Sequence, residues 1–200
     1  TAANVVAHAA GVATRTRRAV RTARTASESV RVAATRKTTP GLRGVEKRAV
    51  AAGGGDTHRL TLSGLVMVKD NHVAEMGLEA AVESFRDRKS FATNLEVEVE
   101  SPAAAVRAAD AGADVVLLDN LPPATVREAV DRVPDRVVTE ASGGITLDSL
   151  PAYPETRVDV VSLGSLTHRA PLLHVSFRPQ GRWPPHPRAP PPPARPRRPP

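Results

Sequence analysis

Three short segments near the start of the chain gather cationic side chains among glycine, proline and threonine. Residues 35–43 read Thr-Arg-Lys-Thr-Thr-Pro-Gly-Leu-Arg, residues 53–59 end in Asp-Thr-His-Arg, and residues 69–72 read Lys-Asp-Asn-His. Guanidinium groups bind carboxylates and phosphates through paired hydrogen bonds, and lysine adds a point charge. The usual alternative for such residues is a solvated basic surface. Because glycine and proline interrupt these segments, we predict instead a pocket for a small anion with several charges.

Acidic side chains follow in the middle of the chain. Glu96, Glu98 and Glu100 alternate with valines, which sends all three to one face of a predicted strand. Asp119 comes directly after the apolar run 115–118. An acidic edge strand and a helix cap are the structural alternatives for these residues. We expect Asp119 and one of the three glutamates to be functional, facing cations, a metal ion or sugar hydroxyls.

Two glycine-containing segments, Ser142-Gly143-Gly144 and Ser162-Leu163-Gly164-Ser165, each follow a predicted strand, and His168 lies one turn later. Their backbone N–H groups could bind a phosphate. Either segment alone is a weak signal, because glycine-rich turns are common, and a lone histidine is more often structural. Together, however, they occupy the two late positions at which βα barrels usually bind phosphate.

Apolar, β-branched segments alternate with alanine-rich segments from about residue 65 onward. The predicted strands are Leu65–Val68, Leu95–Val99, Val115–Leu118, Arg136–Thr139 and Val158–Leu163, and the predicted helices are Ala9–Ala26, Leu78–Arg88, Pro102–Ala111, Pro123–Val133 and Leu147–Ala152. This alternation predicts an α/β fold with a parallel sheet and right-handed crossovers. In a barrel of such units the carboxyl ends of the strands form the active-site face. We therefore expect the polar residues above to meet at one rim.

The composition limits the classes of protein to consider. Two hundred residues suggest one domain, and an aromatic content of 2% leaves Val, Ala and Leu to build the core. The absence of cysteine excludes disulfides and thiolate metal sites. Neither a signal peptide nor an apolar run long enough to cross a bilayer is visible. We therefore expect a soluble cytoplasmic protein with no membrane partner.

The net charge of +7 would ordinarily suggest nucleic-acid binding. No acidic residue follows Asp159, however, whereas seven arginines do, and without them the chain has 21 basic and 21 acidic residues. We therefore expect no nucleic-acid partner for the body of the protein. The expected division is a helical lead-in over 1–34, a catalytic barrel over 35–177 and a disordered tail rich in proline and arginine over 178–200.

These motifs, in this order and spacing, resemble the nicotinate-nucleotide pyrophosphorylase family, whose members are also called quinolinate phosphoribosyltransferases (carboxylating). The resemblance covers roughly residues 4–177 and rests on 35–43, 53–59, 69–72, 96–100, 117–120, 140–145 and 162–168. It implies an open or incomplete parallel α/β (TIM-like) barrel. It also implies that quinolinate and phosphoribosyl pyrophosphate, with Mg2+, are converted to nicotinate mononucleotide, CO2 and pyrophosphate in de novo NAD biosynthesis. Family members are homodimers or larger assemblies.

The resemblance further implies the roles of individual residues. The substrate-binding set would be Thr35, Arg36, Lys37, His58, Arg59, Lys69, Glu98, Asp119, Ser142, Gly143, Gly144, Leu163, Gly164, Ser165 and His168. The first cations would bind the quinolinate carboxylates and the pyrophosphate, and the glycine segments a phosphate. Lys37, Lys69, Glu98 and Asp119 would be catalytic. Mg2+ would be bound with phosphoribosyl pyrophosphate, and no direct protein ligand is expected for it other than Glu98 and Asp119.

The sequence departs from the family pattern in several places. Ala34 and Gly64 stand where the family usually has Asp, Arg48 where it has Tyr, and Arg169 and His174 where it has Ser and Asp. The family's N-terminal sandwich domain has no counterpart in this sequence. We therefore expect an N-terminally truncated enzyme with weak or no activity on its own.

Two other functions are compatible with the sequence. The first is a phosphoribosyltransferase for another acidic base such as nicotinate; a dicarboxylate would instead require Arg36, Lys37, Arg59 and Lys69 to act together. The second is a non-catalytic remnant whose tail binds nucleic acid or an acidic partner. Salt-dependent binding that disappears when residues 178–200 are removed would support it.

Overall fold

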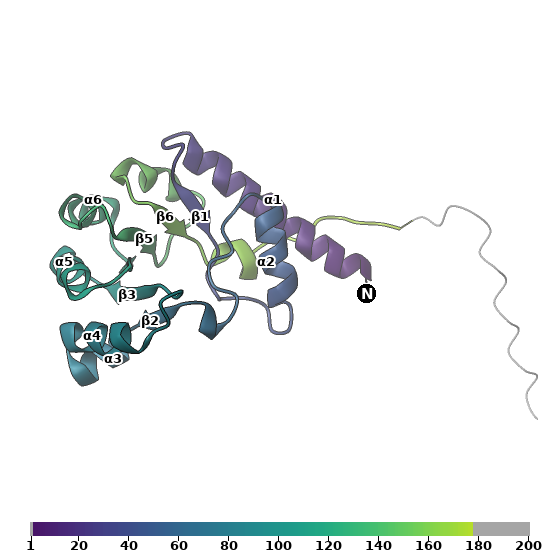
Figure 1. Cartoon of the computed structure of the whole chain (residues 1–200). Helices are drawn as coiled ribbons and strands as arrows, with labels where there is room; N and C mark the ends of the chain where they lie inside the picture. Colours follow the sequence, from purple (N-terminus) through teal and green to yellow (C-terminus); the bar gives the residue numbers. More distant parts are fainter. Residues whose placement is uncertain (1, 178–200) are drawn as a thin grey trace, which may run out of the picture.

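The computed structural model describes residues 2–177 (Figure 1). At its centre is one parallel sheet in the order β1-β6-β5-β4-β3-β2. The strands are β1 (Arg31–Ala33), β2 (Val66–Val68), β3 (Leu95–Val99), β4 (Val115–Asp119), β5 (Val138–Ser142) and β6 (Val160–Ser162). Because β1 and β2 are both edges, the sheet is not closed, and the predicted open α/β barrel is confirmed. The predicted disorder of 178–200 lies outside the described residues.

Helices alternate with the strands and cover the sheet from outside (Figure 1). They are α1 (Ala2–Arg24), α2 (Arg43–Ala52), α3 (Asp70–Met76), α4 (Leu78–Arg88), α5 (Pro102–Ala111), α6 (Pro123–Arg132) and α7 (Ser165–His168), with 3-10 turns at Leu62–Gly64, Leu150–Ala152 and Pro154–Thr156. Among the described residues, none of these helices is both long and apolar enough to span a bilayer.

Local sequence explains where α5 begins and ends. Ser101 accepts a hydrogen bond from the backbone N–H of Ala104 at 3.2 Å, and Pro102 occupies the first turn, where no N–H is needed. Gly112 ends the helix with φ of 107°, a left-handed conformation that glycine adopts without strain. The bounds expected for α4 and α5 are both confirmed.

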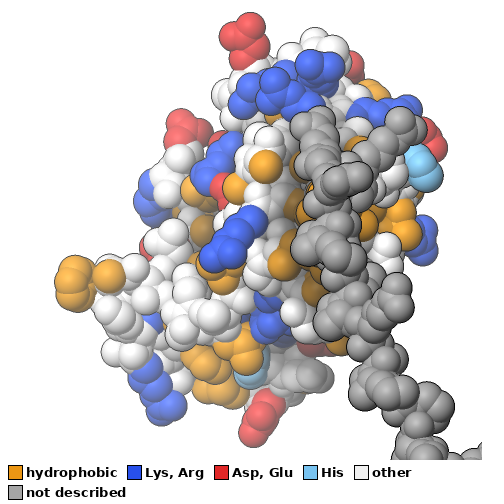
Figure 2. Space-filling view, turned by 90° about the vertical axis from the view of Figure 1, so that its right-hand side faces the viewer, with side chains coloured by type: hydrophobic (Ala, Val, Ile, Leu, Met, Phe, Trp, Pro, Cys, Tyr) orange, Lys and Arg blue, Asp and Glu red, His pale blue; other side chains and the backbone are white. Residues whose placement is uncertain are grey.

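The core is built from small and branched side chains. The buried face of α5 is made of alanines, which lets the helix lie close to the sheet, and Val116 and Leu118 of β4 are fully buried against it. Such close packing compensates for the scarcity of aromatic residues. On the face that Figure 2 shows, Lys and Arg side chains stand in several groups between apolar, uncharged and acidic ones.

Several predicted bounds are wrong. The helix expected over Ala9–Ala26 is α1, which begins at Ala2 and ends at Arg24, and the strand expected over Val158–Leu163 is the shorter β6. β5 begins at Val138 rather than Arg136, because Pro134 starts a turn in which its carbonyl accepts from Val137 N at 2.9 Å. This shift brings Glu140 and Ser142 into the strand. The helix expected over Leu147–Ala152 is instead a single 3-10 turn at Leu150–Ala152, and a second follows at Pro154–Thr156. Each has a proline, Pro151 or Pro154, in its first two positions.

The sequence interpretation missed β1, α2, α3 and α7. β1 lies within residues 1–34, where only a helical lead-in was expected, and it pairs with β6 through Arg31↔Val160 and Ala33↔Ser162. Residues 1–34 therefore contribute one edge of the sheet as well as α1.

A loop spans the gap between the two edges of the sheet. Asp56 forms a parallel bridge with Ala33 of β1, and Asp56 N donates to Val32 O at 2.8 Å. Three residues later, Arg59 Nη2 lies 3.1 Å from Met67 Sδ of β2. Residues 56–59 thus partly close the barrel and bring His58 and Arg59 into its interior.

Candidate active site

The carboxyl ends of the strands surround an open cavity of about 370 Å³. Its walls are Thr35, Arg36, Lys37, His58, Arg59, Met67, Lys69, Glu98, Leu117, Asp119, Glu140, Ser142 and Gly143. The structure therefore brings together the predicted cations and carboxylates and the first glycine segment. This is the end of the sheet at which βα barrels carry their reactive groups.

The second glycine segment lies beside the cavity rather than on its wall. A Cβ at Gly164 would stand 3.3 Å from Thr35 Oγ1 and 3.4 Å from Lys37 Cδ, so the loop 35–37 packs directly on this glycine. Thr167 of α7 donates from Oγ1 to the carbonyl of Lys37 at 2.7 Å. The end of the described chain therefore fixes the loop that carries the first cations.

The remaining predicted residues of this segment have different surroundings. Leu163 is fully buried in the core. His168 lies near Gly164: a Cβ added at Gly164 would stand 3.3 Å from the His168 ring. Within the described residues, the buried Oγ of Ser165 has no hydrogen-bond partner. Neither Ser165 nor Leu163 lines the cavity, and Leu163 is structural.

At Gly143 the ends of β4 and β5 pack closely against each other. Its φ is 86°, and a Cβ there would lie 2.6 Å from Asn120 N and 2.8 Å from Asp119 Oδ1. Asn120 N in turn donates to Ser142 O at 2.8 Å. Only glycine fits at position 143. The neighbouring Gly144 also has positive φ, 62°, and lies against Asn120 Oδ1, outside the cavity wall.

The cavity carboxylates are held beside lysines. Lys69 Nζ donates to Glu98 Oε2 at 2.5 Å. Burial and the negative charge of Glu98 raise the pKa of Asp119 above its usual value, while Lys37 and Lys69 oppose this rise. Of the three alternating glutamates, Glu98 lines the cavity. Glu96 lies deeper and is fully buried, and Glu100 is exposed.

The cations are also close enough to influence one another. Partial desolvation, together with the positive charges of Arg43 and Arg59, lowers the pKa of Arg36. Like charges crowded around one cavity repel each other. A bound anion with several charges would relieve that repulsion, so the cavity is electrostatically suited to such a ligand.

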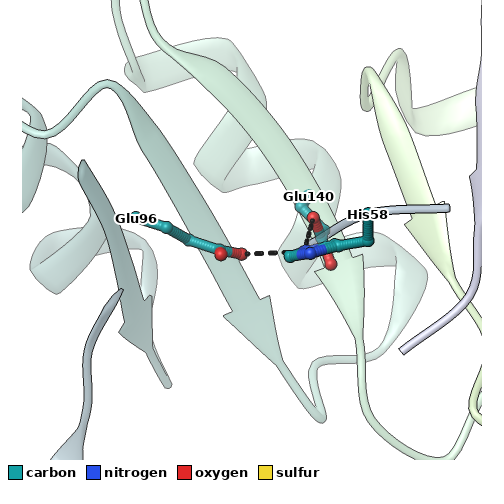
Figure 3. Close-up of side chains that lie close together, drawn as sticks. All are labelled: His58, Glu96 and Glu140. Atoms are coloured by element: carbon teal, nitrogen blue, oxygen red, sulfur yellow. Dashed lines mark ion pairs between the residues drawn. The ribbon is translucent and has the colours of Figure 1, made fainter. Parts of the chain in front are cut away.

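His58, Glu96 and Glu140 form a cluster in the barrel interior (Figure 3), where His58 and Glu140 also line the cavity and Glu96 does not. His58 Nε2 lies 3.3 Å from Glu140 Oε2 and 3.6 Å from Glu96 Oε1. His58 has a φ of 50°, and its N–H donates to Asp56 Oδ1 at 2.7 Å. The sequence suggested that His58 binds substrate directly. Although it lines the cavity, its Nε2 is directed at the two glutamates.

One imidazole and two carboxylates could in principle hold a divalent metal ion. The backbone N–H of Arg59, however, donates to His58 Nδ1 at 2.7 Å. A neutral ring with Nδ1 accepting must carry its proton on Nε2, and a charged ring carries one there as well. Nε2 therefore has no free lone pair for a metal, and we assign the cluster as a hydrogen-bonded group of ionisable residues.

The cluster also changes the protonation of its members. Burial alone would lower the pKa of His58, but hydrogen bonds to Glu140 and Glu96, and their charges, outweigh it and raise the pKa to about 9. Burial raises the pKa of Glu96. Because the second proton of His58 must go to Nδ1, charging the ring requires Arg59 N–H to release that atom. The protonation of His58 and the backbone position of Arg59 are therefore coupled.

We predict that His58 titrates near pH 9 rather than at its usual 6.5. A raised histidine pKa stabilises the fold fully below pH 6.5, and this contribution is lost as the pH rises through about 9. Glu140→Gln removes one of the charges and should move the titration back toward 6.5. NMR titration of the imidazole resonances measures both values. The matched control is Glu155→Gln, at an exposed site. A parent protein whose His58 titrates at or below 6.5 would contradict the assignment.

Comparison with known proteins gives concordant matches. The family model described as "Quinolinate phosphoribosyl transferase, C-terminal domain" matches residues 12–178. The "Probable nicotinate-nucleotide pyrophosphorylase [carboxylating]" of Methanothermobacter thermautotrophicus is 48% identical over 184 residues, which is 89% of this chain and 66% of that protein. The human "Nicotinate-nucleotide pyrophosphorylase [carboxylating]" is 49% identical over 184 residues, 88% of this chain and 61% of that protein.

Solved structures agree with these matches. The crystal structure of NadC from Streptococcus pyogenes superposes with a TM-score of 0.83 at 40% sequence identity, covering 89% of this chain and 62% of that one. The chain thus spans slightly less than two thirds of the length of the M. thermautotrophicus and human proteins.

Proposed function

Because the chain belongs to the quinolinate phosphoribosyl transferase family, we propose that it takes part in the transfer of a phosphoribosyl group from phosphoribosyl pyrophosphate to quinolinate, with decarboxylation, to give nicotinate mononucleotide. The observation that carries this proposal is the composition of one cavity. Arg36, Lys37, Arg59 and Lys69 line it together with Glu98 and Asp119. Such a cavity offers cations for anionic substrates and carboxylates for a positively charged transition state.

Substrate binding would use the cations. The two carboxylates of quinolinate and the pyrophosphate group each carry charge that paired guanidinium hydrogen bonds can hold in a fixed orientation. Gly143, which lines the cavity, would supply a backbone donor for the phosphate of the ribose. Holding both substrates in this way would place the pyridine nitrogen against ribose C1, and such positioning lowers the barrier substantially.

The chemistry would then depend on electrostatics. The bond from ribose C1 to pyrophosphate breaks as the pyridine nitrogen forms its bond, and positive charge develops at C1. Glu98 and Asp119 would stabilise that charge, while Lys37 and Lys69 stabilise the departing pyrophosphate. In the second step the bond from C2 to its carboxyl group breaks, CO2 leaves, and C2 takes a proton from water. The positively charged ring nitrogen accepts the electron density during this step.

We also propose that Mg2+ binds together with phosphoribosyl pyrophosphate. Glu98 and Asp119 would offer it oxygen ligands, and its charge would offset the burial of Asp119 and the repulsion from Glu98 that together raise the pKa of Asp119. Mg2+ would supply charge neutralisation for the pyrophosphate. From the family resemblance we also propose a homodimer or larger assembly and a cytoplasmic location.

The number of cations favours quinolinate over nicotinate. A monocarboxylate needs one pair of donors, whereas Arg36, Lys37, Arg59 and Lys69 all line the same cavity. Leaving several cations without an anionic partner in a bound complex would cost affinity. The proposal therefore names the dicarboxylate as the substrate.

We expect the chain to release pyrophosphate and CO2 in equal amounts from phosphoribosyl pyrophosphate and quinolinate. A single-turnover assay with protein in excess suits an enzyme whose rate is expected to be low. Calorimetry with quinolinate tests the cavity independently of turnover. Nicotinate in place of quinolinate is the control, since it has no second carboxylate to lose as CO2. A protein that neither binds quinolinate nor forms product would overturn the proposal.

A further inference from the structure

α2 directs two charged side chains into the protein instead of into solvent. Glu46 and Lys47 are 0% and 1% exposed, whereas the next residue, Arg48, is exposed. Buried charges are costly unless hydrogen bonds compensate them. Neither residue belongs to the cavity wall, and the mechanism above uses neither. Their burial therefore calls for an explanation of its own.

Lys47 connects two segments that are distant in sequence. Its Nζ donates to the carbonyl of Ala34 at 2.7 Å and also to the carbonyl of Thr57. Ala34 directly precedes the loop 35–37, and Thr57 directly precedes His58 and Arg59. One ammonium group is thus bound to the base of both cation-bearing segments.

Both acceptors are neutral carbonyls, so Lys47 is not neutralised by a direct carboxylate partner at these contacts. Burial, which outweighs the attraction of Asp56 and Glu140 and acts alongside repulsion from Arg43 and Arg36, lowers the pKa of Lys47 to about 8. A lowered lysine pKa means that the charged form is destabilised in the fold. An apolar side chain of similar length would avoid that cost but would leave the carbonyls of Ala34 and Thr57 without this donor.

Glu46 acts on the same loop from the neighbouring position. Its Oε2 accepts from Thr39 N at 3.1 Å, and its Oε1 pairs with His8 Nε2 of α1 at 2.7 Å. α2 therefore holds the segment 34–39 at both ends, at Ala34 through Lys47 and at Thr39 through Glu46.

We propose that Lys47 is a positioning residue for the reaction: it joins the carbonyls of Ala34 and Thr57 so that the cations of 35–37 and those of 58–59 face the same ligand. Lys47 does not touch the substrate. It acts by limiting the relative movement of two loops that no strand pairing connects beyond the Ala33↔Asp56 bridge. The effect on substrate affinity rests on the proposed function, whereas the effect on loop mobility does not.

The test compares Lys47→Met with Arg48→Met, which removes a similar cationic chain from an exposed site of the same helix. We expect Lys47→Met to unfold at a somewhat lower temperature than the parent, because two carbonyls lose their donor. Hydrogen exchange, followed by mass spectrometry, should accelerate at least fivefold in peptides covering 34–40 and 56–62. Quinolinate affinity, measured by calorimetry, should fall about 3- to 10-fold, as expected for lost hydrogen bonds. Arg48→Met should change none of these.

Lys47→Arg provides the rescue, because its guanidinium can still donate to both carbonyls. We expect it to recover most of the exchange protection and affinity. Lys47→Met that matches Arg48→Met in both measurements, or Lys47→Arg that is as impaired as Lys47→Met, would overturn the proposal. If Lys47→Met does not fold, Lys47→Arg against the parent decides by the same exchange comparison. A parent that does not bind quinolinate would overturn the proposed function, while the exchange data would still decide the role of Lys47.

Discussion

Replacing Asp119 with asparagine should lower kcat about 100- to 1,000-fold, the usual cost of losing one preorganised electrostatic group at a developing charge. The asparagine keeps the shape of the side chain at the end of β4, where Asp119 Oδ1 lies against Gly143. The substitution removes only the negative charge that we propose faces ribose C1. Affinity for quinolinate should change little, because Asp119 belongs to the carboxylate side of the site. Single-turnover release of pyrophosphate measures the effect.

The matched control is Asp110→Asn, an exposed position on α5. The pH dependence gives a second check. Because the pKa of Asp119 is raised, the parent's rate should begin to fall on acidification at a higher pH than for an ordinary aspartate, as the carboxylate is protonated. That loss should be absent from the variant. A kcat reduced less than fivefold would show that Asp119 carries no such charge interaction.

Replacing Arg59 with glutamine should weaken quinolinate binding about 10- to 100-fold, which corresponds to one lost charged hydrogen-bond pair. Arg59 lines the cavity, and its backbone is held by His58 and by the contact of its Nη2 with Met67 Sδ. Nicotinate, with one carboxylate fewer, should lose much less affinity. The ratio of the two affinities, measured by calorimetry, reports the loss of discrimination.

Arg127→Gln on the exposed face of α6 is the control for the loss of one guanidinium group. Equal losses for quinolinate and nicotinate would place Arg59 at the carboxylate that both ligands share, or at the pyrophosphate. An unchanged affinity for both would remove Arg59 from the binding site.

The sequence predicted a helix or strand most accurately where residues that start or end such an element lie at its own ends. α5 has Ser101 and Pro102 at its start and Gly112 after its end, so its bounds could be predicted. β4 is a continuous apolar run ending in Asp119, which marked both the strand and its rim residue. These start and end residues act through the conformational preferences of neighbouring residues, so they can be recognised without knowledge of the tertiary structure.

The missed features depend on contacts between distant residues. β1 is a strand of three residues whose identity comes from its pairing with β6, and nothing in Arg31–Ala33 distinguishes it from a loop. No helix was predicted over α2, and the burial of its Glu46 and Lys47 depends on contacts with distant segments that the local sequence does not show. The cluster of His58, Glu96 and Glu140 could be predicted only in part. Strand alternation places Glu96 on the face of Glu98, but the loop that delivers His58 has no periodicity.

The pairing of β1 with β6 has a consequence for the order in which the protein is made. At about 5 to 20 residues per second, a ribosome needs roughly 6 to 26 s to synthesise the residues between Arg31 and its partner Val160. During that time β1 has no strand to pair with. Thr35 and Lys37 likewise wait for Gly164 and Thr167, which pack against them. The loop 35–37 is therefore translated well before the residues that pack against it, and these contacts can form only once Gly164 and Thr167 have been made.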